Sequence, residues 1–171
     1  MATYFLTGAT GYIGGSVAAA LVERGHLVRG LVRSPDKAAH LAERGVTPVL
    51  GDLGNCDLLT SEARASDGVI NTANADHSGA VEALIAGLGG SNKPLVHTSG
   101  SSIVGDDARG MFRTDAIFDE ETPLLVHPMK QARRDIDLMV LKAADRGVRS
   151  AVICPSLIYG LGQGLNRKSV Q

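Results

Sequence analysis

The sequence predicts an α/β protein built on a doubly wound parallel sheet, and three observations carry this prediction. Short apolar runs alternate with longer amphipathic runs from the first residue onward, as expected of βα units around a sheet that is buried on both faces. The 21 glycines lie at the ends of these runs, where turns between elements are expected. The 171 residues are in the size range of one domain, so we expect a single domain over 1–171.

Six strands and five helices follow from this alternation. The expected strands are 3–7, 27–33, 46–51, 68–72, 94–99 and 149–154. The expected helices are 11–24, 35–44, 57–65, 78–88 and 127–146. Ser34 followed by Pro35 is typical of a helix start, and Gly25, Gly45 and Gly147 stand where helices are expected to end.

Segment 100–125 interrupts this rhythm and is expected to be a long loop after the fifth strand. Open α/β sheets bind ligands at the carboxyl ends of their strands, and loops of this length are often functional. We therefore expect this loop to lie near a ligand site.

Composition excludes several classes of function. A formal net charge of −1 provides no basic excess for a nucleic acid, and no apolar run reaches the ~18 residues of a membrane span. Cys56 and Cys154 have no partner at the spacing of a metal site or a disulfide framework. We expect a cytoplasmic protein without a metal, in which Cys154 is a small buried apolar residue.

The first expected strand runs directly into the loop Gly8-Ala9-Thr10-Gly11-Tyr12-Ile13-Gly14, and an alanine-rich helix follows. Glycine is needed where the chain turns sharply, where backbone approaches a pyrophosphate, and where the helix packs closely on the sheet. The start of the helix offers free N–H groups and the positive end of its dipole to phosphates. This loop therefore predicts a dinucleotide site.

The spacing of the loop, GxxGxxG after Thr7, resembles that of the extended and atypical short-chain dehydrogenase/reductase superfamily, which contains NAD-dependent epimerases and dehydratases. Four later segments are similar to motifs of the same superfamily. They are Gly51-Asp52-Leu53, Asn71-Thr72-Ala73-Asn74, Val96-His97-Thr98-Ser99-Gly100 and Ile153-Cys154-Pro155-Ser156-Leu157-Ile158-Tyr159-Gly160.

The resemblance implies a Rossmann fold with strand order 3-2-1-4-5-6 and a nicotinamide dinucleotide as cofactor. It implies that the C-terminal substrate region of extended members is largely absent, because the chain stops at Gln171. It also implies a cofactor-binding role for Thr7, Gly8, Gly11, Tyr12, Ile13, Gly14, Asp52, Leu53, Thr72, Ala73, Asn74, Thr98 and Pro155.

The end of the second strand favours NADP over NAD. In Rossmann folds an acid here binds the ribose 2′-OH of NAD, whereas an arginine accommodates the 2′-phosphate of NADP. The strand ends Leu31-Val32-Arg33-Ser34 without an acid, and Lys37 follows in the next helix. The guanidinium of Arg33 suits a phosphate, with a solvated strand-end arginine as the alternative. NADP is our prediction, and NAD remains possible.

The usual catalytic pair of the superfamily, Tyr-x-x-x-Lys, is missing. No tyrosine occurs between Tyr12 and Tyr159. Aligning the last helix on Asp137 places Met129 and Arg133 at the two positions, and a shift of two places His127 and Gln131 there. Neither alignment restores a tyrosine and a lysine.

Three side chains are candidates for the missing proton donor. Ser99 and Ser101 flank the expected serine position, with hydrogen bonds to loop backbone as the alternative role. His127 could supply an imidazole, or cap the helix that follows it. His97 is expected to be a packed strand residue.

Two function hypotheses remain at this stage. The first is an NAD(P)-dependent oxidoreductase or an epimerase/dehydratase-like enzyme, acting on a small carbonyl, carbinol or sugar-type substrate. The second is a non-catalytic NADP(H)-binding sensor or regulatory protein. Helix 127–146 is also a candidate surface for a homodimer.

Overall fold

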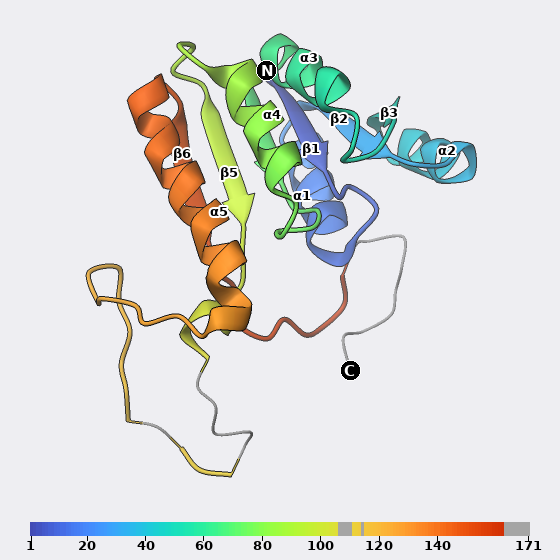
Figure 1. Ribbon diagram of the computed structural model, residues 1–171. Helices are drawn as coiled ribbons and strands as arrows, with labels where there is room; N and C mark the ends of the chain where they lie inside the picture. Colours follow the sequence, from blue (N-terminus) through green and yellow to red (C-terminus); the bar gives the residue numbers. More distant parts are fainter. Residues whose placement is uncertain (106–110, 114, 163–171) are drawn as a thin grey trace.

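The computed structural model describes residues 1–105, 111–113 and 115–162. Its centre is a six-stranded sheet in the order β3-β2-β1-β4-β5-β6, with every neighbouring pair parallel (Figure 1). The predicted fold class and strand order are confirmed. The strands are β1 Thr3–Thr7, β2 Leu27–Val32, β3 Val46–Leu50, β4 Gly68–Asn71, β5 Pro94–Thr98 and β6 Arg149–Ile153.

The helices agree with the predicted pattern except at the last one. Instead of one helix over 127–146, the chain forms two short 3₁₀ helices around a shorter α-helix. Pro128 opens the first 3₁₀ turn, where a proline is tolerated. The helices are α1 Tyr12–Glu23, α2 Pro35–Glu43, α3 Cys56–Ala65, α4 Ser78–Leu88, η1 Ser101–Val104, η2 Pro128–Lys130, α5 Gln131–Lys142 and η3 Ala143–Arg146.

The predicted helix ends are largely confirmed. Gly25, Gly45 and Gly147 follow their helices with φ of +76°, +76° and +70°, in the left-handed region that glycine adopts readily. Ser34 stands at the N-cap of α2, but its side chain makes no capping hydrogen bond. Asn55 does cap α3, because its Oδ1 accepts from the Leu58 N–H at 3.1 Å.

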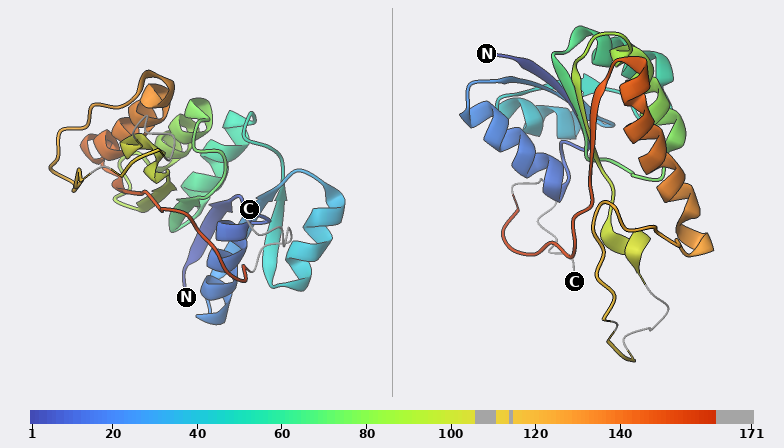
Figure 2. Two further views of the ribbon diagram at one scale, coloured as in Figure 1. Left: turned by 90° about the horizontal axis from the view of Figure 1, so that it is seen from below. Right: turned by 90° about the vertical axis from the view of Figure 1, so that its left-hand side faces the viewer.

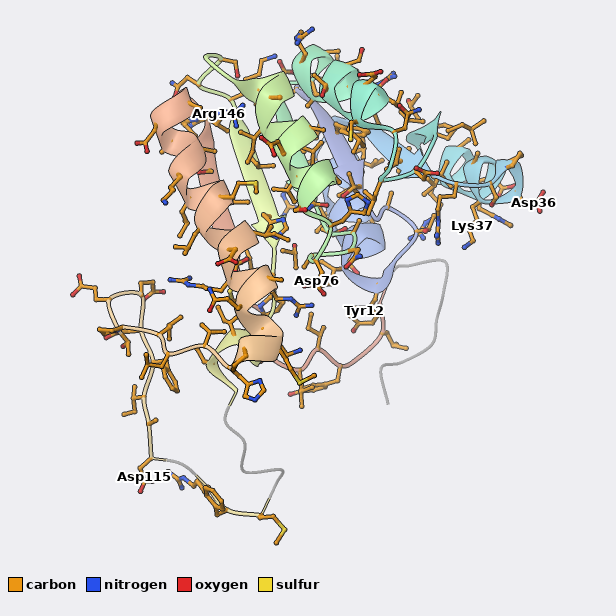
Figure 3. All side chains as sticks on the ribbon, in the orientation of Figure 1. Tyr12, Asp36, Lys37, Asp76, Asp115 and Arg146 are labelled. Carbon is orange, nitrogen blue, oxygen red and sulfur yellow. The ribbon has the colours of Figure 1, made fainter. Side chains whose placement is uncertain are left out.

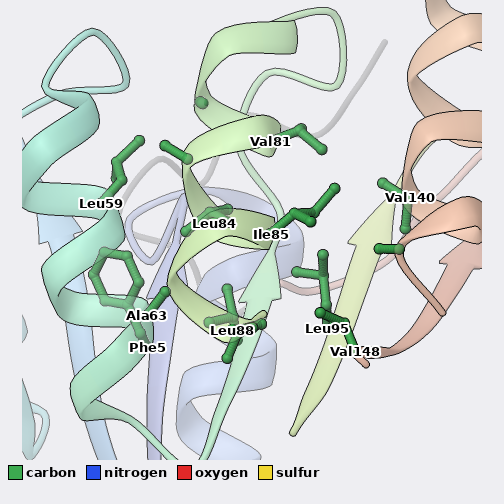
Figure 4. Packing of buried hydrophobic residues seen from close by; sticks show 14 of the residues in the cluster. Phe5, Leu59, Ala63, Val81, Leu84, Ile85, Leu88, Leu95, Val140 and Val148 are labelled. Carbon is green, nitrogen blue, oxygen red and sulfur yellow. The ribbon is translucent and has the colours of Figure 1, made fainter. Parts of the chain in front are cut away.

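Helices cover the sheet on both faces, with α1 and α2 on one side and α3, α4 and α5 on the other (Figure 2). Successive strand residues point to opposite faces. Phe5 accordingly belongs to the core under α3, α4 and α5, and its neighbour Leu6 to the core under α1 and α2. Figure 4 shows Leu84, Ile85 and Leu88 of α4 at the centre of the larger core.

Burial on both faces does not extend to β6, which lies at the edge of the sheet. Its side chains alternate between exposed and half-buried, and Ile153 is 52% exposed. Cys154, which follows β6, is exposed, so its expected burial as an apolar residue is wrong. The reason is that α5 covers one face of this strand, while α1 and α2 cover strands farther along the sheet.

The direction of strand order reverses between β1 and β4. One half of the sheet runs outward through β2 and β3, and the other through β5 and β6, so the connections leave a crevice at the carboxyl ends of β1 and β4. The predicted loop 100–125 also begins at this edge and contains η1, although residues 106–110 and 114 of it lie outside the described residues. None of the helices within the described ranges is long and apolar enough to cross a membrane.

Candidate functional site

A cleft of about 650 Å³ opens at the crevice where the strand order reverses. This volume is in the range of small-molecule sites. Its walls come from the end of β2, from the start of α2, and from the turns that follow β1, β3 and β4. Most of the predicted cofactor residues line it, namely Gly8, Gly11, Arg33, Asp52, Leu53, Thr72, Ala73 and Asn74.

The loop requires glycines because the backbone at Gly8, the start of α1 at Gly14 and the backbone of Thr72 after β4 lie in close contact. Gly8 has a φ of +73°, and a Cβ on it would lie 2.7 Å from the carbonyl carbon and oxygen of Thr72. A Cβ on Gly14 would lie 2.1 Å from the carbonyl oxygen of Gly8. Larger residues would therefore push α1 away from β1 and β4.

The start of α1 is open toward the cleft. Gly11 is its N-cap and supplies no side chain to the free N–H groups of the first turn. The Gly11 N–H itself donates to the Gly8 carbonyl at 2.8 Å, which closes the turn. A helix start of this kind, facing a cleft, suits a pyrophosphate.

The far end of the cleft is positively charged. Arg33 directly follows β2 and Lys37 lies in the first turn of α2, and both line the cleft. No ion pair joins either of them to an acid in the described part of the chain. Figure 3 shows Asp36 on the outer side of α2, away from the glycine loop. The strand β2 ends without the acid that would bind the ribose hydroxyl of NAD.

Two further side chains of the cleft hold turns. Asp52 accepts a hydrogen bond from the Gly54 N–H at 2.8 Å, which fixes the turn between β3 and α3. His77 caps α4, since its Nδ1 accepts from the Ala80 N–H at 3.1 Å. Sequence reasoning missed His77 as a cleft residue, although its place directly before the predicted helix 78–88 is an N-cap position.

A row of buried polar side chains crosses the protein beside the cleft. The Thr7 hydroxyl donates to Asn71 Oδ1, and Asn71 Nδ2 lies 2.9 Å from His97 Nδ1. On the other side of the imidazole, His97 Nε2 lies 3.9 Å from Asp137 Oδ1. The Ser99 hydroxyl donates to Asp137 Oδ2 at 2.9 Å. The row thus joins β1, β4 and β5 to α5.

Burial decides the charges in this row. It lowers the pKa of His97, against the opposing effect of the Asp137 carboxylate, because a charged imidazole loses its hydration there. Burial likewise raises the pKa of Asp137, while the hydrogen bond from Ser99 lowers it. His97 is therefore neutral at neutral pH, and its contact with Asp137 is not an attraction between two full charges.

Arg133, at one of the two positions expected for the family's lysine, forms a two-pronged ion pair. Its Nε and one terminal nitrogen donate to the Asp76 carboxylate at 2.8 and 2.7 Å, and its other terminal nitrogen donates to Ser102 Oγ at 3.1 Å. The hydrogen bond from Arg133 lowers the pKa of Asp76. Arg133 thereby ties α5 to η1 and to the turn before α4.

Comparison with known proteins identifies the family. The sequence profile of the NAD(P)H-binding family matches residues 8–135, which is more than half of the chain. The chain belongs to the NAD(P)H-binding family. The expected resemblance to the short-chain dehydrogenase/reductase superfamily with its epimerase/dehydratase-like members is confirmed.

The relatives of this NAD(P)H-binding protein are reductases, an oxidase and uncharacterized proteins. An oxidase from an Acremonium species is 39% identical, with 94% of this chain and 51% of the relative covered. A 4-hydroxy-2-methyl-3-oxo-4-farnesyl-3,4-dihydroquinoline-1-oxide ketoreductase from Stigmatella aurantiaca is 30% identical, with 91% and 50% covered. The chain spans about half the length of these relatives.

Solved structures show the same fold at lower identity. Vestitone reductase from alfalfa has a TM-score of 0.67 at 16% identity, with 95% of this chain and 59% of the reductase covered. A UDP-glucose-4-epimerase from Stenotrophomonas maltophila with bound NAD has a TM-score of 0.69 at 15% identity, with 90% and 52% covered. These likenesses establish the architecture of the NAD(P)H-binding chain.

The remaining predicted cofactor residues do not line the cleft. Thr7 is fully buried and its hydroxyl donates a hydrogen bond to Asn71. It therefore supports the glycine loop from inside the protein. Gly14 packs against Gly8. The other residues predicted to bind the cofactor that lie outside the lining of the cleft are Tyr12, Ile13, Thr98 and Pro155.

The three predicted catalytic residues differ in their surroundings. Ser99 follows β5 and is 8% exposed, and its hydroxyl donates a hydrogen bond to the Asp137 carboxyl group. The Ser101 N–H donates to the Pro155 carbonyl at 3.1 Å. His127 is exposed and caps η2, since its Nδ1 accepts from the Met129 N–H at 3.3 Å. The capping role weighed for His127 is thus present, and the proton-donor role remains a prediction.

Proposed function

We propose that this chain forms the cofactor-binding part of an NADPH-dependent oxidoreductase that acts on a small carbonyl or carbinol substrate. The observation that carries the proposal is the cleft itself. It has a glycine loop and an open helix start at one end, and Arg33 with Lys37 at the other, where β2 ends without an acid. The ketoreductase of Stigmatella aurantiaca and the putative dihydroflavonol 4-reductase of Synechocystis among the relatives support the choice of reaction.

The residues present fit an NADP molecule. Gly8 and Gly11 leave room for the pyrophosphate at the start of α1. Arg33 and Lys37 supply two cations for the 2′-phosphate of the adenosine half. Leu53 lines the cleft beside them and offers an apolar surface to the adenine ring. The bound nicotinamide supplies or accepts a hydride, and the protein supplies orientation and proton transfer.

Ser99 is the best placed of the candidate proton donors. It directly follows β5, the strand next to β4 on the side away from the adenosine end of the cleft. A serine hydroxyl has a high pKa of its own and transfers a proton effectively only with a partner that shares it. Ser99 has such a partner in Asp137, whereas His127 is bonded to the backbone of η2.

The choice of cofactor is tested by an Arg33→Ala variant. A lost charge-assisted hydrogen bond costs about 1.5–3 kcal/mol, so NADPH should bind about 10–150 times more weakly while NADH binding stays nearly unchanged. The measurement is a fluorescence titration with each nucleotide. Arg24→Ala is the matched control, since Arg24 lies at the other end of α1 and bonds to the Ala20 carbonyl. Equal weakening of both nucleotides by Arg33→Ala would contradict the proposal.

A second candidate function is a NADP(H) sensor without turnover. The observation that favours it lies on α5 and the turn before it. Met129 stands at the expected tyrosine position and is 83% exposed, and Arg133 is held by Asp76 instead of facing a ribose. Single-turnover mixing of the NADPH-bound protein with a panel of ketones and aldehydes separates the two functions. Oxidation of NADPH that depends on Ser99 supports the enzyme, and a complete absence of oxidation supports the sensor.

A further inference from the structure

The buried row beside the cleft contains a carboxyl group that the cofactor does not need. We propose that Asp137 is a positioning residue that holds the proton which Ser99 exchanges with the substrate oxygen, and that His97 orients its carboxyl group. This inference rests on the proposed oxidoreductase function and extends it to the missing tyrosine. The geometry of Thr7, Asn71, His97, Asp137 and Ser99 carries it.

The hydrogen bonds of the row fix the position of the proton on His97. Asn71 Oδ1 accepts from the Thr7 hydroxyl and, at 3.4 Å, from the Ala73 N–H. The amide nitrogen of Asn71 therefore faces His97 Nδ1, and an amide nitrogen can only donate. Nδ1 must accept, so the proton of the neutral ring is on Nε2. This tautomer follows from the network.

The Nε2–H group of His97 is directed at Asp137. The 3.9 Å between Nε2 and Oδ1 is too long for a hydrogen bond. Both atoms are buried and have no partner within the described residues. Buried polar atoms without partners are costly, and they commonly mark a functional group. A shift of about 1 Å would bring the pair to hydrogen-bond distance, so His97 can stabilise the carboxylate when Asp137 loses its proton.

Ser99 connects this carboxyl group to the edge of the sheet where substrates bind. Asp137 is 1% exposed and lies on the buried side of α5. Ser99 is 8% exposed and stands at the carboxyl end of β5, between the strand and η1. A proton reaches Asp137 from that edge through the Ser99 hydroxyl, because the hydroxyl both accepts and donates.

Ionisable groups on β5, after β6 and on α5 lie around the Asp137 carboxyl group. On β5, burial keeps His97 neutral by lowering its pKa. After β6, partial desolvation of the Cys154 thiol and then the charge of Asp137 raise the pKa of Cys154, which keeps the thiol protonated. On α5 itself, the positive charges of Arg134 and Arg133 lower the pKa of Asp137 and so oppose the effect of burial. Asp137 is the acid among these groups whose pKa burial moves toward neutral pH.

The proton step is balanced in both directions. In oxidation, the carbinol O–H proton moves to Ser99 Oγ while the Ser99 proton moves to Oδ2 of the Asp137 carboxylate, and the carbinol carbon loses a hydride to the nicotinamide. In reduction, the carbonyl carbon gains the hydride, its oxygen takes the Ser99 proton, and Ser99 takes the proton of the Asp137 acid. The serine is neutral before and after each step, so the pair replaces a tyrosine as a general acid and base.

The first experiment measures the titration of Asp137 in the unmodified full chain. The aspartate carboxyl carbons are isotope-labelled and followed by NMR over pH, with and without NADP⁺. We expect one signal to titrate above the ordinary aspartate range, to vanish in Asp137→Asn and to remain in Asp135→Asn. Asp135 is the matched control because it lies on the exposed side of α5, where its carboxylate accepts a hydrogen bond from the Gln131 side chain. A wild-type Asp137 signal with an ordinary aspartate pKa overturns the inference.

The second experiment measures NADPH oxidation by phenanthrenequinone over the same pH range. General acid–base catalysis contributes about 100-fold or more, so Asp137→Asn and Ser99→Ala should each slow turnover by about that factor. The double variant should be no slower than either single variant, because the residues act as one unit. NADPH affinity should stay near that of the wild type, since neither residue lines the cleft.

The outcomes separate the two proposals. A wild-type chain that binds no NADPH, or binds it without turnover, overturns the proposed function. Turnover that keeps its rate and pH profile in Asp137→Asn overturns the inference alone. If Asp137→Asn fails to fold, as a thermal melt would reveal, Ser99→Ala and the wild-type carboxyl titration decide the question instead. Normal turnover in Ser99→Ala then refutes the relay.

Discussion

Replacing Gly8 by alanine is expected to destabilise the protein more than the same change at Gly25, although the two glycines share one backbone conformation. Their φ angles are +73° and +76°. A Cβ at position 8 meets the backbone of Thr72 at 2.7 Å, whereas a Cβ at position 25 has nothing within 4 Å. The pair therefore separates the cost of the left-handed conformation from the cost of crowding at the glycine loop.

The magnitudes follow from these two costs. An alanine in the left-handed region costs about 1–2 kcal/mol, which is the whole effect expected for Gly25→Ala. Overpacking adds about 1–3 kcal/mol where the neighbour is backbone and cannot rotate away. Gly8→Ala should thus lower the free energy of unfolding by about 2–5 kcal/mol. It should also displace α1 from the cleft and weaken NADPH binding.

The assay is urea unfolding at equilibrium, followed by circular dichroism, with NADPH affinity measured on the same samples. Midpoints are compared at equal slopes, since a changed slope would indicate a different unfolding transition. Gly14→Ala is a useful third variant. It adds a Cβ 2.1 Å from the Gly8 carbonyl oxygen without an unusual φ. Equal losses in Gly8→Ala and Gly25→Ala would refute the close packing of the loop on Thr72.

Two further predictions concern caps and acid sensitivity. Asn55→Ala should lower the free energy of unfolding by about 1 kcal/mol, because Asn55 caps α3, whereas Ser34→Ala at the uncapped start of α2 should change it far less in the same urea assay. The pKa of His97 is lowered from 6.5 in the folded state, so the unfolded chain binds a proton there first and stability falls as the pH decreases below about 6.5. His97→Asn keeps an acceptor for Asn71 and should make the free energy of unfolding, measured with urea across pH, depend less on pH below about 6.5. An unchanged pH dependence in this variant would show that His97 does not cause it.

The fold could be predicted because its determinants are local. The turn at Gly8, the helix ends at Gly25 and Gly45, and the alternation of short apolar and amphipathic runs each depend on a few consecutive residues. The adenosine end of the cleft follows for the same reason, since strand ends meet along one edge of a parallel sheet. Arg33 and Asp52 line the cleft because each directly follows a strand.

The part of the site around β5 and α5 was harder to predict, because its contacts join residues that are distant in sequence. The sequence shows Asp137 only as a position on which to align the last helix, and it predicts a packed strand residue at His97. The contact between them depends on how α5 packs against β6 and α4, which no local pattern specifies. The same holds for Arg133, whose partner Asp76 comes from another turn. Cys154 was wrongly expected to be buried, because the sequence does not reveal that β6 forms an exposed edge.

The central claim is that NADP binds in the cleft between the glycine loop and Arg33. Amide NMR spectra recorded with NADP⁺ and with NAD⁺ test it most directly. We predict that both nucleotides shift the signals of Gly8, Gly11 and Thr72, and that only NADP⁺ shifts those of Arg33 and Lys37. Shifts confined to other surfaces such as β6, or identical shifts at Arg33 with both nucleotides, would contradict the claim.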